Sequence, residues 1–145
     1  MELGLVSISF RGHSPEELIG AAKEAGLGCI EWGSDIHAPC EDEENLRRIA
    51  AMQLSAGISC CSYGTYFKLG QDKPEALIPY IRAAKLLGTN ILRLWCGTKG
   101  SREYSPEELE LLPEELLFSL ALRVTWLYRK ISLEFLDSYG TTNKS

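Results

Sequence analysis

The sequence predicts an α/β fold of parallel (β/α) units, an incomplete (β/α)₈ barrel (TIM barrel) of about five strands and four helices. Three observations predict it. Helix-like and strand-like segments alternate along the chain, an internal repeat spaces them evenly, and the strand-like segments are mostly apolar. Alternation of this kind implies parallel pairing through right-handed crossovers, and mostly apolar runs are typical of strands buried on both faces.

The repeat is marked by three glycines, Gly26, Gly57 and Gly88, and each lies between a helical pattern and a β-rich run. Glycine is favoured just after a helix, where the backbone turns left-handed. The glycines are 31 residues apart, which is roughly the length that one unit of a (β/α)₈ barrel uses. A chain of 145 residues holds fewer than five such units and cannot close an eight-stranded barrel alone.

The helix starts are also visible. Ser14 and Ser105 each begin a Ser-Pro-Glu-Glu run, which offers an N-cap serine, a proline in the first turn and a glutamate that completes a capping box. Apolar residues at helical spacing fill the helices, and β-rich runs fill the strands. The expected elements in chain order are strand 3–10, helix 15–25, strand 28–33, helix 43–56, strand 58–64, helix 75–87, strand 90–96, helix 106–129 and strand 131–135.

The barrel domain is expected over residues 4–135, with a C-terminal tail at 136–145. A five-stranded open sheet of the flavodoxin-like kind is the other architecture that fits this pattern. Such a fold usually carries a phosphate-binding loop after its first strand. Here that loop, residues 10–14, has a single glycine and no glycine-rich motif, so the barrel is favoured.

Composition limits the partners and the compartment. The chain has 15 Lys and Arg against 20 Asp and Glu, a net charge of −5, so a nucleic-acid surface is not expected. No apolar run is long enough to span a membrane, and the N-terminus does not look like a signal peptide. The five cysteines form no C-x-x-C pair, which argues against a disulfide scaffold or a zinc ribbon. We expect a cytoplasmic protein with no membrane partner.

Ligands bind at the carboxyl ends of the strands in both architectures. Glu31 and Glu134 are the most informative residues there, because each interrupts an apolar β run, and an unpaired buried carboxylate is costly. Strand alternation directs both glutamates inward. The structural alternative is that Glu134 forms an ion pair with Arg93. The other polar and aromatic residues at these ends fit solvated loops or core packing equally well: Arg11, His13, Trp32, Asp35, His37, Tyr63, Tyr66, Trp95 and Lys99.

Five short motifs follow one another at successive strand ends. They are the helix start at Ser14–Glu17, Glu31–Gly33 with Asp35–Pro39, Cys61–Tyr66, Arg93–Gly97, and Leu133–Phe135. In this order they resemble the N-terminal part of the sugar phosphate isomerase/epimerase family, whose domain is a xylose-isomerase-like TIM barrel. The resemblance spans roughly residues 4–135. Beyond this range the sequence departs from the family, because Leu136–Thr142 stands where the family usually has a His and a Gly-Thr-Leu-Thr motif.

The resemblance implies a proton or hydride shift next to a sugar carbonyl, assisted by Mn²⁺, Mg²⁺ or Co²⁺. It places the metal-ligand and catalytic roles on Glu134, and substrate contacts on Glu31, Trp32, His37, Tyr63 and Trp95. The family holds its ion with side chains from strands five to eight, so this chain alone is expected to be incomplete and inactive, and the metal is expected for the complete family domain. The expected partner is a sugar or sugar phosphate.

Two other functions stay open. The chain could be a non-catalytic sugar-binding or interaction module on a half-barrel. An endonuclease of the same barrel superfamily is disfavoured by the acidic charge and by the presence of only two histidines. An incomplete barrel also exposes strand edges, so self-association through them is expected.

Overall fold

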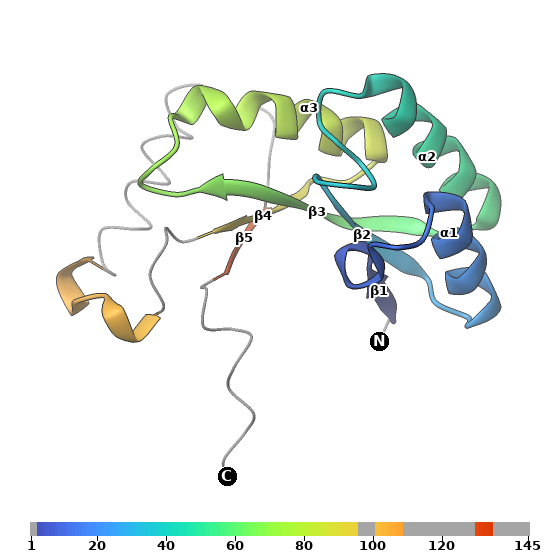
Figure 1. The fold of residues 1–145 in the computed structure, drawn as a ribbon, viewed down its shortest axis with the longest axis horizontal. Helices are drawn as coiled ribbons and strands as arrows, with labels where there is room; N and C mark the ends of the chain where they lie inside the picture. The colour runs from blue at the N-terminus through green and yellow to red at the C-terminus, as the bar shows by residue number, and fades with distance from the viewer. Residues whose placement is uncertain (1–2, 96–100, 109–129, 135–145) are drawn as a thin grey trace, which may run out of the picture.

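The computed structural model describes residues 3–95, 101–108 and 130–134, the last of these as backbone only. Five parallel strands form one sheet in chain order, β1-β2-β3-β4-β5 (Figure 1). The strands are β1 (Gly4–Val6), β2 (Cys29–Gly33), β3 (Ser59–Lys68), β4 (Ile91–Trp95) and β5 (Lys130–Glu134). Sequential parallel order is the order of a (β/α) barrel, and it excludes the strand-order reversal of a flavodoxin-like sheet.

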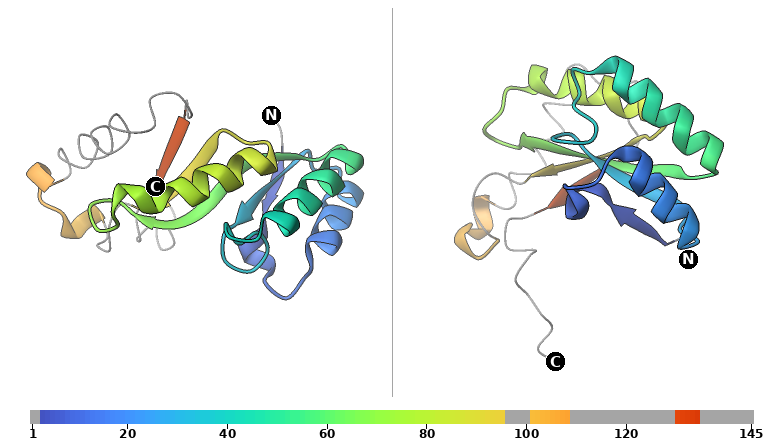
Figure 2. Two further views of the ribbon diagram at one scale, coloured as in Figure 1. Left: turned by 90° about the horizontal axis from the view of Figure 1, so that it is seen from above. Right: turned by 45° about the vertical axis from the view of Figure 1, so that its right-hand side comes forward.

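The first four of these strands are connected by the helices α1 (Pro15–Glu24), α2 (Glu43–Ala56) and α3 (Leu77–Leu87). Short 3₁₀ turns lie at η1 (Ser7–Phe10), η2 (Pro74–Ala76) and η3 (Ser101–Glu103). The three α-helices cover the same face of the sheet (Figures 1 and 2). Among the helices that the structure describes, none is both long enough and apolar enough to cross a membrane.

The predicted helix boundaries are confirmed closely where the caps are strong. At α1 the Ser14 hydroxyl accepts the Glu17 backbone N–H, and the Glu17 carboxylate accepts the Ser14 N–H at 2.7 Å. Helices α2 and α3 end at Gly57 and Gly88, whose φ values of 74° and 84° lie in the left-handed region. The repeat seen in the sequence is therefore a repeat of helix-to-strand turns.

Strand boundaries differ more from expectation. The first strand, expected over 3–10, ends at Val6, because the chain turns into η1 and the Ser7 hydroxyl accepts the Gly33 N–H at 2.9 Å. The third strand continues to Lys68, beyond the expected end at 64. Residues 106–108 are helical as expected, and the remainder of helix 106–129 and the tail at 136–145 lie outside the described residues.

The core fills the space between the sheet and the helices. Ile30 and Trp32 of β2 point toward the helices, as do Tyr63 of β3 and Leu92 of β4, and all four are buried. Gln53 of α2 crosses this layer: its amide oxygen accepts the Trp32 indole N–H at 2.9 Å, and its amide N–H₂ donates to the Leu87 carbonyl at 2.7 Å. The other face of the sheet, which faces the interior in a closed barrel, carries the polar residues.

Candidate functional site: the carboxyl ends of the strands

An ion pair between β2 and β4 lies on the interior face of the sheet. Arg93 Nε donates to Glu31 Oε1 at 2.9 Å, and the two side chains are 7% and 13% exposed. The Ser62 hydroxyl donates to the other Glu31 oxygen at 2.5 Å. Glu31 thus faces away from the helices, as alternation predicts, and Arg93 pairs with Glu31 across β3. A buried charge is costly unless it has a partner of opposite charge, and here Glu31 and Arg93 supply that partner to each other.

Gly64 makes room for this pair. It lies between Glu31 and Arg93 on β3, and a Cβ added there meets Arg93 Nη2 at 2.6 Å and Glu31 Oε1 at 3.3 Å. Any side chain at this position therefore displaces the guanidinium group. Ser62 and Gly64 belong to the Cys61–Tyr66 motif, but only the strand register shows that they contact the Glu31–Arg93 pair.

Trp95 borders the same face at the end of β4. Its indole N–H donates to the Thr65 carbonyl at 3.0 Å, and the Arg93 guanidinium carbon lies 5.7 Å from its ring centroid. This hydrogen bond forms because β3 is irregular here: Gly64 pairs with Arg93, yet Lys68 pairs with Trp95. The half-buried ring therefore lies beside the Arg93 guanidinium at the carboxyl end of β4, and its substrate-binding role stays a prediction.

A second polar cluster forms the rim of the site. Arg11 follows β1, Asp35 follows β2, and Tyr66 lies near the end of β3. Arg11 forms an ion pair with Asp35 and donates to the Tyr66 hydroxyl at 3.0 Å, while that hydroxyl donates to Asp35 at 3.0 Å. The cluster ties together the first three strand ends. We use the term mouth for the Glu31–Arg93 ion pair, Trp95 and this polar cluster taken together.

The pKa of Asp35 is lowered. Burial acts to raise it, but hydrogen bonds from the Ile36 backbone, the Tyr66 hydroxyl and the Arg11 guanidinium lower it by more. The pKa of Arg11 is raised by its hydrogen bonds to Tyr66 and Asp35. Both members of the pair are therefore ionised at neutral pH.

Two expected substrate-binding residues lie elsewhere. Trp32 is fully buried against α2, where its indole binds Gln53. Tyr63 is also fully buried: its hydroxyl donates to the Ala38 carbonyl at 2.5 Å, and its ring lies 6.4 Å from that of Tyr80 on α3. Both positions alternate with interior residues and so point at the helices. Their expected place at the mouth is wrong, and both serve the core.

His37 is buried as well, at 2% exposure. Its Nε2 lies 3.0 Å from the His13 carbonyl, and its ring lies 6.2 Å from that of Trp32. Its Nδ1 is buried and has no hydrogen-bond partner within the part of the chain that the structure describes. His37 thus links the loops that follow β1 and β2, and the structure does not bring it together with Glu31 and Arg93.

Glu134 is described only through its backbone. It ends β5 at the register position opposite Trp95, and Ser132 lies opposite Arg93. This register places the Glu134 backbone next to Trp95, at the carboxyl end of the sheet. The metal-ligand and catalytic roles of Glu134 stay predictions.

A divalent metal does not fit the residues that the structure describes. No group of three or more His, Cys, Asp and Glu side chains lies close enough to hold an ion in that part of the chain. The Glu31 oxygens bind Arg93 and Ser62, and Asp35 is paired with Arg11. Both carboxylates already bind protein donors, and among the described residues no third ligand lies beside them, so no chemical step is assigned to a metal here.

The thiols of Cys40 and Cys60 are poor nucleophiles. Burial raises the pKa values of Cys60 and Cys40 to about 12, so both stay protonated at neutral pH. Cys60 faces the core and its neighbour Cys61 is exposed. Cys60 and Cys61 therefore point away from each other, and Cys60 packs in the core.

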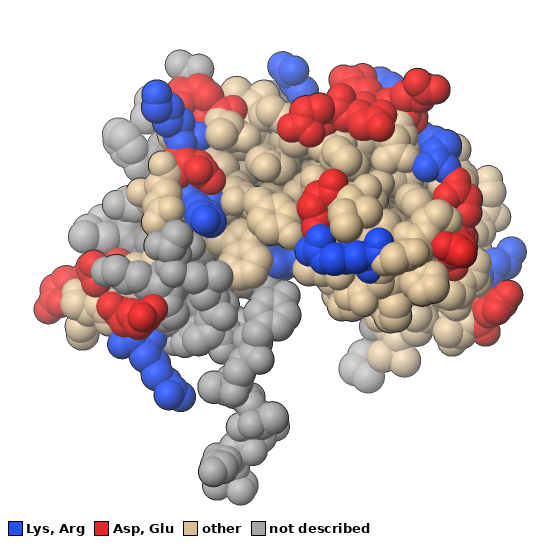
Figure 3. Space-filling view, in the orientation of Figure 1, with Lys and Arg blue, Asp and Glu red and all other residues tan. Residues whose placement is uncertain are grey.

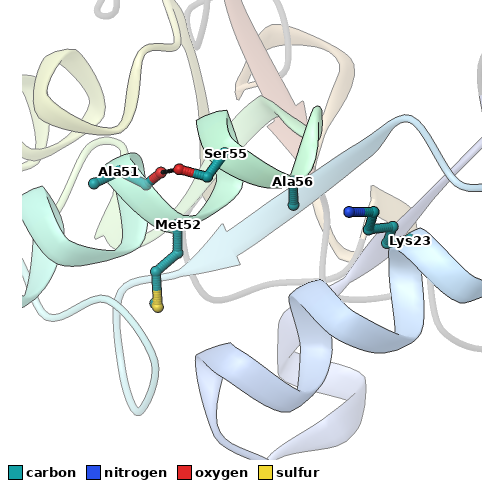
Figure 4. Close-up of a pocket in the computed structure, with 5 residues that line it drawn as sticks. All are labelled: Lys23, Ala51, Met52, Ser55 and Ala56. Carbon is teal, nitrogen blue, oxygen red and sulfur yellow. Dashed lines mark hydrogen bonds between the residues drawn. The ribbon is translucent and has the colours of Figure 1, made fainter.

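Two surface features lie apart from the mouth. Figure 3 shows acidic side chains gathered over the start of α2, where Asp42 caps the helix and Glu43 and Glu44 occupy the first turn. A hollow of about 440 Å³ separates the last turns of α1 and α2 (Figure 4). It is lined by Lys23, Ala51, Met52, Ser55 and Ala56. Because helices run antiparallel to the strands, this hollow lies at the opposite edge of the sheet from the mouth.

Comparison with known structures identifies the fold. A probable 3-DHS dehydratase, AsbF, from Bacillus anthracis matches with a TM-score of 0.71 at 20% identity, over 91% of this chain and 52% of its own. Xylose isomerase domain proteins from Salmonella typhimurium LT2 and Alicyclobacillus acidocaldarius match with TM-scores of 0.65 and 0.61, at 16% and 18% identity. They are covered over 48% and 49% of their length, against 90% and 92% of this chain.

The chain thus has the fold of a partial xylose-isomerase-like TIM barrel and spans about half the length of the structures it matches. No family model and no curated protein matches the sequence.

Proposed function

We propose that this chain forms the sugar-binding part of a barrel of the sugar isomerase or epimerase kind, with the ligand at the carboxyl ends of the strands. The observation that carries the proposal is the buried Glu31–Arg93 pair on the interior face, beside Trp95. Two of the structures it matches are described as xylose isomerase domain proteins, which supports the same class.

The chemistry of the mouth suits a polyhydroxylated ligand. Each Glu31 oxygen accepts one hydrogen bond from the protein, and a carboxylate oxygen has two lone pairs, so each can accept a ligand hydroxyl as well. Trp95 offers an aromatic surface to the C–H groups of a sugar ring. The ion pair fixes the Glu31 carboxylate in position, which reduces the ordering cost of binding.

The reaction proposed for the complete barrel is a proton or hydride shift next to a carbonyl, with a divalent metal as expected from the sequence. Because the described residues hold no metal cage, we expect the 145-residue chain to bind sugars without converting them.

Binding is tested by saturation-transfer NMR with xylose, glucose, fructose and ribose. We expect saturation transfer to at least one free sugar. Ser62→Ala and Gly64→Ala both disturb the Glu31–Arg93 pair, so each should weaken the affinity for that sugar at least fivefold, which corresponds to about 1 kcal/mol or more of binding free energy. Ser55→Ala on α2 and Gly20→Ala on α1 are matched controls that leave binding unchanged. Absence of any transfer, or equal loss in the controls, contradicts the proposal.

Turnover is tested separately, by deuterium exchange at the carbon next to the sugar carbonyl with Mn²⁺ present. We expect no exchange above a metal-only reaction. Sugar binding without exchange supports the proposed division of roles, whereas exchange by the chain alone shows that it carries a full catalytic site.

A further inference from the structure

The guanidinium groups at the mouth are already neutralised. Arg93 is paired with Glu31, and Arg11 is paired with Asp35. A phosphate ester carries a charge near −2 and is bound in proteins by cationic or backbone donors that are available to it. Neither pair offers net positive charge to such a ligand.

Two other basic residues near the described strand ends, Lys68 and His13, each have a carboxylate nearby. Lys68 ends β3, at the register position of Trp95, and its backbone N–H donates to the Asp72 carboxylate at 2.6 Å. His13 lies 3.6 Å from Glu17 at the start of α1. At the N-terminus of α1 the capping box engages the Ser14 and Glu17 backbone N–H groups, and Pro15 has no N–H to offer.

A carboxylate and aromatic rings instead supply the recognition surface. Glu31 presents acceptors for hydroxyl donors, and Trp95 and the 45% exposed Tyr66 present ring surface. Hydroxyl groups on one side and C–H groups on the other are the surface of an unmodified sugar.

We propose, building on the sugar-binding function above, that the mouth selects an uncharged sugar and discriminates against its phosphate ester. Arg93 acts as a positioning residue for Glu31, whose carboxylate accepts hydrogen bonds from the ligand hydroxyls, and Asp35 neutralises Arg11.

The test compares glucose, fructose and ribose, each with its terminal phosphate ester, by saturation-transfer NMR on the 145-residue chain. We expect the free sugar to bind at least about tenfold more tightly than the ester, with an affinity that does not change with salt. Asp35→Asn is the decisive variant, because it keeps the shape of the side chain and removes the charge that neutralises Arg11. It is expected to raise ester affinity about tenfold in a salt-sensitive way.

Glu43→Gln is the matched control, since it releases Arg47 from an exposed ion pair on α2, away from the mouth. It is expected to leave both affinities unchanged. Tighter binding of the ester by the unmodified chain, weakened by salt and by Lys68→Gln, overturns the inference while the sugar-binding function stands. An ester affinity unchanged in Asp35→Asn also overturns it. Failure of both ligands to bind contradicts the sugar-binding function itself.

Discussion

Asp35 joins three strand ends, and its ionisation should be visible in the stability of the protein. Its pKa is lower in the folded chain than in the unfolded chain, where it is near 4. A depressed folded value means that the ionised group contributes stability above the unfolded pKa, and that this contribution is lost as pH falls through the folded pKa.

We therefore expect Asp35→Asn to lower the urea midpoint at pH 7, with a difference from the unmodified chain that shrinks as the pH falls below about 4. Urea titrations from neutral to acidic pH measure this. Glu43→Gln should differ little at pH 7, because exposed ion pairs contribute about 1 kcal/mol at most. A difference for Asp35→Asn that stays constant with pH contradicts the role given to its charge.

Tyr63 and Tyr66 are close in sequence but differ in what their hydroxyls do. Tyr63→Phe removes a buried hydrogen bond and leaves the Ala38 carbonyl without it, which should cost about 1–3 kcal/mol of unfolding free energy. Tyr66→Phe should cost less, because water can replace the hydroxyl of an exposed ring. Equal losses in denaturant unfolding would show that Tyr63 is not anchored as described.

At the scale of elements, the glycines divide into two kinds. Gly57 closes α2 with φ 74°, a conformation that costs an L-residue about 1–2 kcal/mol. Gly20 lies inside α1 with open space around it, and alanine there gains about 0.5–1 kcal/mol of helix stability. We expect Gly57→Ala to lower, and Gly20→Ala to raise, the unfolding free energy measured with urea. Shifts of the same sign would contradict the assignment of Gly57 to the helix end.

Elements were predictable where local chemistry fixes them. The capping box at Ser14 and the glycines after α2 and α3 are short-range signals, and helix 43–56 was predicted to the residue. Strand ends depend on partners distant in sequence. The first strand stops at Val6 because Ser7 binds Gly33, and the third continues because Lys68 pairs with Trp95. Neither contact leaves a local signature.

The site was predictable in part for the same reason. Alternation correctly turned Glu31 toward the interior, and the same rule, applied to the adjacent Trp32, places it against the helices rather than at the mouth. Tyr63 was harder, because the β2–β3 register shifts between Ile30 and Glu31. That irregularity sets which β3 residues face Glu31, and it brings Ser62 rather than Cys61 to the carboxylate.

At the scale of the whole molecule, β1 is an edge strand among the described residues. Leu3, Val6 and Phe10 lie on or beside it and are 58%, 40% and 45% exposed. Exposed apolar side chains beside unpaired backbone groups favour association with another chain. We expect light scattering to give a mass above 16.1 kDa that rises with protein concentration.

Val6→Lys should reduce this association, because a charge on an edge strand opposes edge-to-edge pairing. Leu54→Lys is the control, since Leu54 is 80% exposed on α2 and away from the edge. A monodisperse monomer at all concentrations, or equal effects of the two substitutions, contradicts association through β1.

Gln53 has a consequence for cooperativity. Its amide accepts from Trp32 of the first repeat and donates to the last turn of α3 in the third, while its own helix belongs to the second. One buried side chain therefore couples three successive repeats, which a string of nearest-neighbour units cannot do. Loss of any one repeat leaves a buried amide without a partner, so these units should open together in native-state hydrogen exchange, as a single foldon.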